Sequence, residues 1–140
     1  MSNCWDQLLC PFFTSSCLFV LKDYFLLLGF NQHRLDRVGG VVFENKDTYV
    51  EISYEAETFP SYSLTLLIGS GSNAVPFWFI IPPTDEASKY TFWKFGNEVE
   101  LRSVLERIKS SVLEPFGKPI WNDAVELDRY LKRFRSEFIQ

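Results

Sequence analysis

Two segments, residues 48–57 and 62–68, alternate strictly between apolar and polar side chains, and this pattern constrains the fold more than any other feature of the sequence. Successive side chains of a β-strand point to opposite faces, so each segment predicts a strand with one face in a hydrophobic core. The core face expected for the first segment consists of Val50, Ile52, Tyr54 and Ala56. The opposite face carries three carboxylates and consists of Tyr49, Glu51, Ser53, Glu55 and Glu57. The sequence therefore predicts an antiparallel sheet with one face open to solvent.

Other segments complete this sheet. Residues 41–44 are expected to form a hairpin with residues 48–57. Residues 76–82 are apolar on both faces and bounded by prolines, which predicts a short strand covered on both sides, and residues 91–95 are expected to pair beside it. Residues 31–37 are polar and are interpreted as a link between elements.

Helices are predicted before and after the strands along the chain. Residues 18–30 carry apolar side chains at three- and four-residue intervals, which predicts an amphipathic helix. Asn97 is expected to cap a second helix that Pro115 and Gly117 end, and a third is expected to begin near Asn122 or Asp123. All 140 residues are therefore expected to form a single α+β domain. It would have an N-terminal helix, a mostly antiparallel sheet of four to five strands, and two C-terminal helices packed on one sheet face.

Composition indicates a folded chain and limits the classes of partner that it is expected to bind. Apolar residues make up 46% of the sequence and aromatic residues 17%, which is ample material for a core. The formal net charge of −4 and the pI of about 5.0 argue against a nucleic-acid surface and favour a basic protein partner. Asp6, Pro11 and Lys22 interrupt the apolar N-terminal region, so neither a signal peptide nor a membrane span is expected.

Three cysteines, Cys4, Cys10 and Cys17, lack the close pairs that zinc sites use. We expect them to be reduced thiols in a cytoplasmic protein, with no assigned role. A Cys3His metal site with His33 is the alternative, but its spacing matches no usual zinc motif.

No catalytic constellation or cofactor motif is found in the sequence, so we expect neither enzymatic activity nor a cofactor. A base or nucleophile needs a second group to activate it, and the only histidine, His33, lies in the polar link. Basic residues on the last predicted helix alternate with acidic ones, which indicates a solvated helix face. These basic residues are Arg129, Lys132, Arg133 and Arg135.

The acidic strand face permits two interpretations. It is either the solvated side of an antiparallel sheet, where charge discourages aggregation, or a surface that docks a basic protein. An active-site carboxylate cluster is a third, less favoured interpretation. The candidate partner-binding residues are Glu51, Glu55, Glu57, Tyr49 and Trp78.

The layout also resembles a known class of proteins. A leading helix, a meander carrying VVFEN and VEISYE, and closing helices with ELRSVLERI and DAVELDRYLKRF resemble the small bacterial immunity-like proteins of polymorphic toxin systems. The resemblance implies binding of a cognate toxin domain, and it transfers no site residue. Two alternatives remain open. One is a small acidic effector chaperone acting as a homodimer, although such chaperones usually place a helix between strands. The other is a protein that binds a small molecule in a pocket between sheet and helices.

Overall fold

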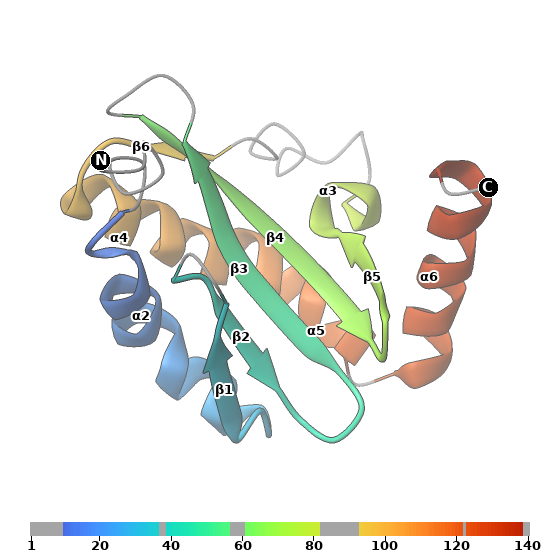
Figure 1. Ribbon diagram of the computed structural model, residues 1–140. Helices are drawn as coiled ribbons and strands as arrows, with labels where there is room; N and C mark the ends of the chain where they lie inside the picture. Colours follow the sequence, from blue (N-terminus) through green and yellow to red (C-terminus); the bar gives the residue numbers. More distant parts are fainter. Residues whose placement is uncertain (1–9, 37–38, 57–60, 82–92, 122, 139–140) are drawn as a thin grey trace.

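The computed structural model describes residues 10–36, 39–56, 61–81, 93–121 and 123–138 (Figure 1). The six strands of its sheet are β1 (Gln32–Leu35), β2 (Val41–Glu44), β3 (Tyr49–Ala56), β4 (Tyr62–Ser70), β5 (Asn73–Pro76) and β6 (Lys94–Phe95). Its helical segments are α2 (Phe13–Leu27), α3 (Phe77–Ile80), α4 (Glu98–Ile108), the π-helix η2 (Lys109–Gly117), α5 (Lys118–Trp121) and α6 (Ala124–Phe138). The predicted α+β class, with an N-terminal helix, an antiparallel sheet and C-terminal helices, is confirmed.

The sheet is an antiparallel meander in the order β1-β2-β3-β4-β5, and β6 pairs with the other end of β4. The register pairs Phe43 of β2 with Val50 of β3, and Ile52 of β3 with Leu66 of β4. Residues paired across strands share a face, so these four side chains lie on one apolar face, and each is at most 3% exposed. The predicted hairpin and third strand are therefore confirmed.

Helix α2 packs on this apolar face. The Phe25 ring stacks on Phe43 with centroids 4.5 Å apart, and it lies 5.7 Å from the ring of Trp121 in α5. At the other end of α2, Phe13 lies 4.5 Å from the Tyr54 ring. Helices α4 and α5 lie behind the same side of the sheet in Figure 1. The hydrophobic core therefore fills the layer between the sheet and these helices.

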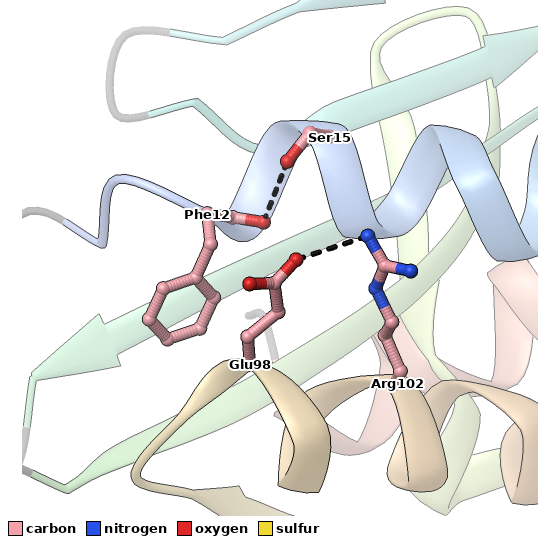
Figure 2. A network of polar contacts seen from close by, with 4 residues as sticks. All are labelled: Phe12, Ser15, Glu98 and Arg102. Carbon is pink, nitrogen blue, oxygen red and sulfur yellow. Dashed lines mark hydrogen bonds and ion pairs between the residues drawn. The ribbon is translucent and has the colours of Figure 1, made fainter.

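Helices α2 and α4 lie side by side (Figure 2), and Arg102 of α4 contacts Phe19 of α2. Arg102 extends from α4 toward α2, donates a hydrogen bond of 2.9 Å to Glu98 Oε1, and places its guanidinium 4.2 Å from the Phe19 ring centroid. On α2, Ser15 Oγ donates to the carbonyl oxygen of Phe12 at 3.2 Å. A cation–π contact between Arg102 and Phe19 therefore links the two helices at the surface.

Residues 77–81 of the predicted buried strand are not a strand, and residue 82 lies outside the described residues. Strand β5 ends at Pro76, and the single helical turn α3 follows. In a strand, Phe77 and Ile80 would point to opposite faces, whereas a helical turn brings residues three apart to one side. Both are at most 4% exposed in the core. The helical turn therefore places both large side chains on one side, toward the core.

The predicted polar link contains strand β1, which pairs with β2. All four of its residues are exposed, so it carries no apolar alternation that would mark a strand. The predicted partner of residues 91–95 also differs, because β6 pairs with β4 through Tyr62 and Phe95. Residues 82–92 lie outside the described part of the chain.

The helix that Asn97 was expected to cap begins as predicted. Asn97 Oδ1 accepts a hydrogen bond of 2.8 Å from the backbone N–H of Glu100, and Glu100 Oε1 accepts one of 2.8 Å from the N–H of Gly96. Pro115 and Gly117, however, do not end the helical run. Both lie inside η2, and α5 follows without a break, so the residue that lacks an N–H stands in a π-helical segment.

The last helix, α6, runs along β5 at the edge of the sheet (Figure 1). Its start is confirmed near Asp123, whose Oδ1 accepts hydrogen bonds from the N–H groups of Val125 and Glu126 at 3.1 and 3.2 Å. Leu127 and Leu131 anchor it in the core. No helix within the described ranges is long and apolar enough to cross a membrane.

Candidate functional site

The sheet face opposite the core carries the acidic side chains singled out in the sequence, and we call it the open face. By register, its side chains on β1 to β4 include Arg34, Val42, Glu44, Tyr49, Glu51, Ser53, Glu55, Ser63, Thr65 and Leu67. The predicted alternation in β3 is confirmed, because its even-numbered residues from Val50 to Tyr54 are buried and Tyr49 to Glu55 on the other face are half-buried or exposed. In Figure 1 the described helices leave this side of β2, β3 and β4 uncovered.

Glu51 is half-buried on the open face between charges of both signs. Burial raises the pKa of its carboxyl group, the nearby Asp36 carboxylate raises it further, and Arg34 lowers it. Arg34 Nε also lies 3.6 Å from Glu44 Oε2. In the cross-strand row, Val42 pairs with both Arg34 and Glu51 and is itself fully buried. A raised carboxyl pKa means that surrounding positive charge does not fully compensate the ionised form, so an added cation would be favourable here.

A polar hollow of about 280 Å³ lies at the β2–β3 hairpin end of the open face. It is lined by Arg34, Glu44, Asn45, Lys46, Asp47, Thr48, Tyr49, Glu51 and Gly71. The hairpin loop is held by Asn45, whose Oδ1 accepts hydrogen bonds from the backbone N–H of Asp47 at 3.0 Å and of Thr48 at 2.8 Å. With charged side chains of both signs around it, the hollow suits a polar or charged group.

Tyr49 lies between this hollow and the β4–β5 turn. Its hydroxyl donates a hydrogen bond of 3.4 Å to the carbonyl oxygen of Asn73. Its ring covers Gly69, where a Cβ atom would lie 2.5 Å from the Tyr49 Cζ atom. Burial raises the pKa of the Tyr49 phenol, and the Glu51 carboxylate raises it further. Tyr49 is therefore a neutral side chain at physiological pH.

The other predicted binding residues lie in different surroundings. Glu55 is exposed on the open face, whereas Glu57 lies outside the described residues. Trp78 is on α3, and its ring contacts outside α3 are to α6, with centroid distances of 5.7 Å to Phe138 and 6.2 Å to Phe134. Glu51 and Glu55 on β3 and Trp78 on α3 thus belong to different elements, and a role for Trp78 in partner binding stays a prediction.

The histidine and the cysteines show no catalytic arrangement in the described residues. His33 is exposed on β1, with its ring 6.3 Å from Phe43. Cys10 and Cys17 are buried free thiols, and burial raises the pKa of both, which disfavours the nucleophilic thiolate. Cys4 lies outside the described residues. Within the described ranges, no three His, Cys, Asp or Glu side chains are grouped so as to hold a metal ion.

Sequence reasoning missed the two charged groups that act on Glu51. Arg34 comes from the unpredicted strand β1, and Asp36 follows that strand. Asp36 is positioned by a backbone pairing, because its N–H donates to the Gly40 carbonyl at 2.9 Å and its Oδ1 accepts from the Gly40 N–H at 2.7 Å. The one available signal is the glycine pair that follows, which is typical of a tight turn between two strands.

A second hollow, of about 380 Å³, lies between helical segments. It is lined by Ile80, Pro115, Phe116, Pro119, Ile120, Asp123, Glu126 and Tyr130. Its walls come from α3, η2, α5, α6 and Asp123 just before α6, so it is formed by helical segments and not by the sheet. Five of its eight lining residues are apolar, and two carry carboxylates.

Comparison with known proteins finds no match for this chain among protein families, curated proteins or solved structures.

Proposed function

We propose that this chain is a non-enzymatic protein-binding module of the immunity type, which neutralises a basic toxin partner by docking it on the open face. The observation that carries the proposal is the half-buried carboxylate of Glu51, whose pKa is raised by burial and by Asp36. A lysine or arginine side chain of a partner would stabilise the ionised form of this group. Glu55, exposed on the same strand face, extends the acidic surface.

Arg34 competes with a basic partner for the carboxylates of the open face, but its ion pair with Glu44 is weak. Its contact with Glu44 is 3.6 Å long, and the Arg34 side chain is 57% exposed. Exposed ion pairs of this kind contribute only about 0–1 kcal/mol. An incoming cation can therefore displace Arg34 from Glu44 at little cost, and complementary charge would speed association.

The chemistry of the thiols fits a cytoplasmic site of action, which is part of the proposal. Cys10 and Cys17 are free and buried, as expected in a reducing compartment.

The proposal is tested by affinity capture of the tagged protein from its native lysate, at low and at high salt. We expect one stoichiometric, basic, salt-sensitive partner, and we expect the purified protein to inhibit the activity of that partner. The double variant Glu51→Gln/Glu55→Lys should lose the partner while it remains folded.

The matched control is Asp23→Asn/Glu106→Lys, which changes exposed acids on α2 and α4. In each double variant the change to an amide adds one unit of positive charge and the change to lysine adds two, so the net charge moves from −4 to −1. The control should keep the partner, because its changes lie away from the open face. A folded Glu51→Gln/Glu55→Lys variant that still captures and inhibits the partner would rule out the open face as the docking surface.

A second candidate function, binding of a small molecule, is favoured by one observation. The hollow between the helical segments has a volume of about 380 Å³, which is within the range of ligand sites, and apolar side chains make up most of its lining. Native mass spectrometry of the purified protein tests this candidate. A retained small molecule that is lost in Ile120→Trp, which would fill the hollow, would favour it over the protein-binding function.

A further inference from the structure

Four aromatic side chains of α3 and α6 form a cluster apart from the open face. We call this cluster the aromatic patch, and it consists of Trp78, Phe79, Phe134 and Phe138. Phe134 and Phe138 stack with centroids 4.9 Å apart, and Phe79 meets Phe134 edge-on at 5.3 Å. Trp78 closes the cluster through its contacts to both α6 rings. The rings hold one another in place, so the patch is a preformed surface.

The outer rings of the aromatic patch are open to solvent. Trp78 is 44% exposed and Phe138 is 56% exposed. The core beneath is already closed, since Phe77 on α3 and Leu131 on α6 are buried. Single exposed apolar residues are normal on a protein surface, whereas contiguous apolar patches mark interaction sites. Tryptophan is also among the residues that contribute most to protein interfaces.

Charges of opposite sign flank the aromatic patch on α6. The Arg133 guanidinium lies 5.3 Å from the Phe79 ring centroid and 5.9 Å from that of Tyr130, so it is held against aromatic faces. Glu137, one helical turn later, is exposed and has no ion-pair partner among the described residues. Elsewhere on α6, two cations are paired within the helix, with Arg129 3.0 Å from Glu126 and Lys132 2.9 Å from Asp128.

We infer that a second copy of this chain docks on the aromatic patch and forms a two-fold dimer with antiparallel α6 helices. A two-fold axis brings the same surface of both copies together, so the surface must be complementary to itself. Apolar rings meet this condition. Antiparallel α6 helices also bring Arg133 of each copy toward Glu137 of the other, whereas a purely acidic or purely basic partner would match only one of these charges.

The dimer would leave the open face available. In Figure 1, α6 lies beyond β5 at one edge of the sheet, and the strands that carry Glu51 and Glu55 lie further in. Dimerisation therefore does not depend on the proposed function, and each can fail without the other.

The test is sedimentation velocity of the full chain from low micromolar to several hundred micromolar concentration. We expect a reversible monomer–dimer equilibrium. Phe138→Ser should raise the dissociation constant at least about tenfold, because a two-fold interface loses the ring twice. The matched control is Val125→Ser, which removes an apolar side chain that is 71% exposed on the same helix outside the aromatic patch. It should change the constant less than about twofold.

A charge exchange tests the antiparallel arrangement. Arg133→Glu should weaken the dimer, and Arg133→Glu combined with Glu137→Arg should restore it. A protein that is monomeric over the whole concentration range overturns the inference, as does a dimer unaffected by Phe138→Ser. Binding of the monomer to anionic lipid vesicles through Trp78 would assign the aromatic patch to a membrane surface instead. Far-UV circular dichroism confirms that each variant is folded.

Discussion

Replacing Gly69 with alanine should destabilise the protein and disturb Tyr49 on the open face. A Cβ atom at this position would lie 2.5 Å from the Asn73 carbonyl oxygen and 2.5 Å from the Cζ and hydroxyl oxygen of Tyr49. Carbon atoms in contact normally stay about 3.5–4.0 Å apart, so the new methyl group overlaps its neighbours on two sides. Something must move, and the two neighbours differ in how easily they can.

The size of the effect follows from these two neighbours. The half-buried Tyr49 ring can swing toward solvent, but the Asn73 carbonyl belongs to backbone that pairs with Ser70 in the β4–β5 hairpin. Overpacking typically costs about 1–3 kcal/mol. Gly69 has no positive φ, so alanine introduces no backbone strain and lowers the entropy of the unfolded chain, which returns about 0.4–1 kcal/mol. We expect a net loss of about 1–2 kcal/mol, or about 3–8 °C in Tm.

Urea denaturation followed by tryptophan fluorescence measures this loss. Ser72→Ala, in the exposed turn nearby, is the control and should stay within about 0.5 kcal/mol of the wild type. Tyr49→Ala combined with Gly69→Ala should recover part of the loss, because one of the two overlaps is removed, and the coupling energy should exceed about 0.5 kcal/mol. A Gly69→Ala variant as stable as the wild type would show that the Tyr49 ring does not rest on this glycine.

Three further predictions concern the core, the site and the thiols. Phe25→Ala should cost about 3–5 kcal/mol in urea denaturation because it empties a fully buried aromatic position, whereas Phe19→Ala, at a side chain 70% exposed, should cost far less; equal losses would contradict the packing of α2. Because burial and Asp36 raise the folded-state pKa of Glu51, ionisation of Glu51 weakens folding as pH rises from the unfolded to the folded pKa. The stability advantage of Glu51→Gln, measured by urea denaturation at several pH values, should therefore grow through this range and stay constant above it; no change with pH would contradict the burial of the carboxylate. Cys10 and Cys17 should resist a thiol-reactive label in the native protein and react in urea, as read by peptide mass spectrometry, and rapid native labelling of Cys17 would contradict its burial.

The position of Arg34 determines how acidic the open face is. Within residues 48–57 the sequence shows three glutamates on one strand face and no lysine or arginine. The structure places Arg34 in the same cross-strand row as Glu51, two strands away, close to Glu44 and within electrostatic range of Glu51. The surface offered to a basic partner is therefore a mixed one, with Glu55 as its most exposed described carboxylate. Partner binding at this face should depend on displacing Arg34 as well as on attraction to the glutamates.

Local signals in the sequence were sufficient for several elements. The alternation through Val50 and Ile52 predicted both the strand and its buried face, because the strand period is fixed by backbone geometry. Asn97 and Asp123 predicted two helix starts, since a capping side chain bonds to backbone groups only two or three residues away. The orientation of Glu51 and Glu55 followed from the same alternation.

Other elements depended on contacts between distant segments. Strand β1 exists because its backbone pairs with β2, and its exposed residues gave no periodic signal. The turn α3 is helical because both Phe77 and Ile80 find room in the core, which propensity cannot reveal. Pro115 stands inside a helical run because a π-helix and α5 continue past it.

The α+β class, the strand β3 and the side on which Glu51 and Glu55 point could be predicted from local patterns, because these depend on periodicities and caps within a few residues. The positions of Arg34 and Asp36 beside Glu51, and of Trp78 against the rings of α6, are set by the folded arrangement of the elements. These arrangements arise from pairing and packing between segments far apart in the chain, and the local pattern of residues carries no record of such distances.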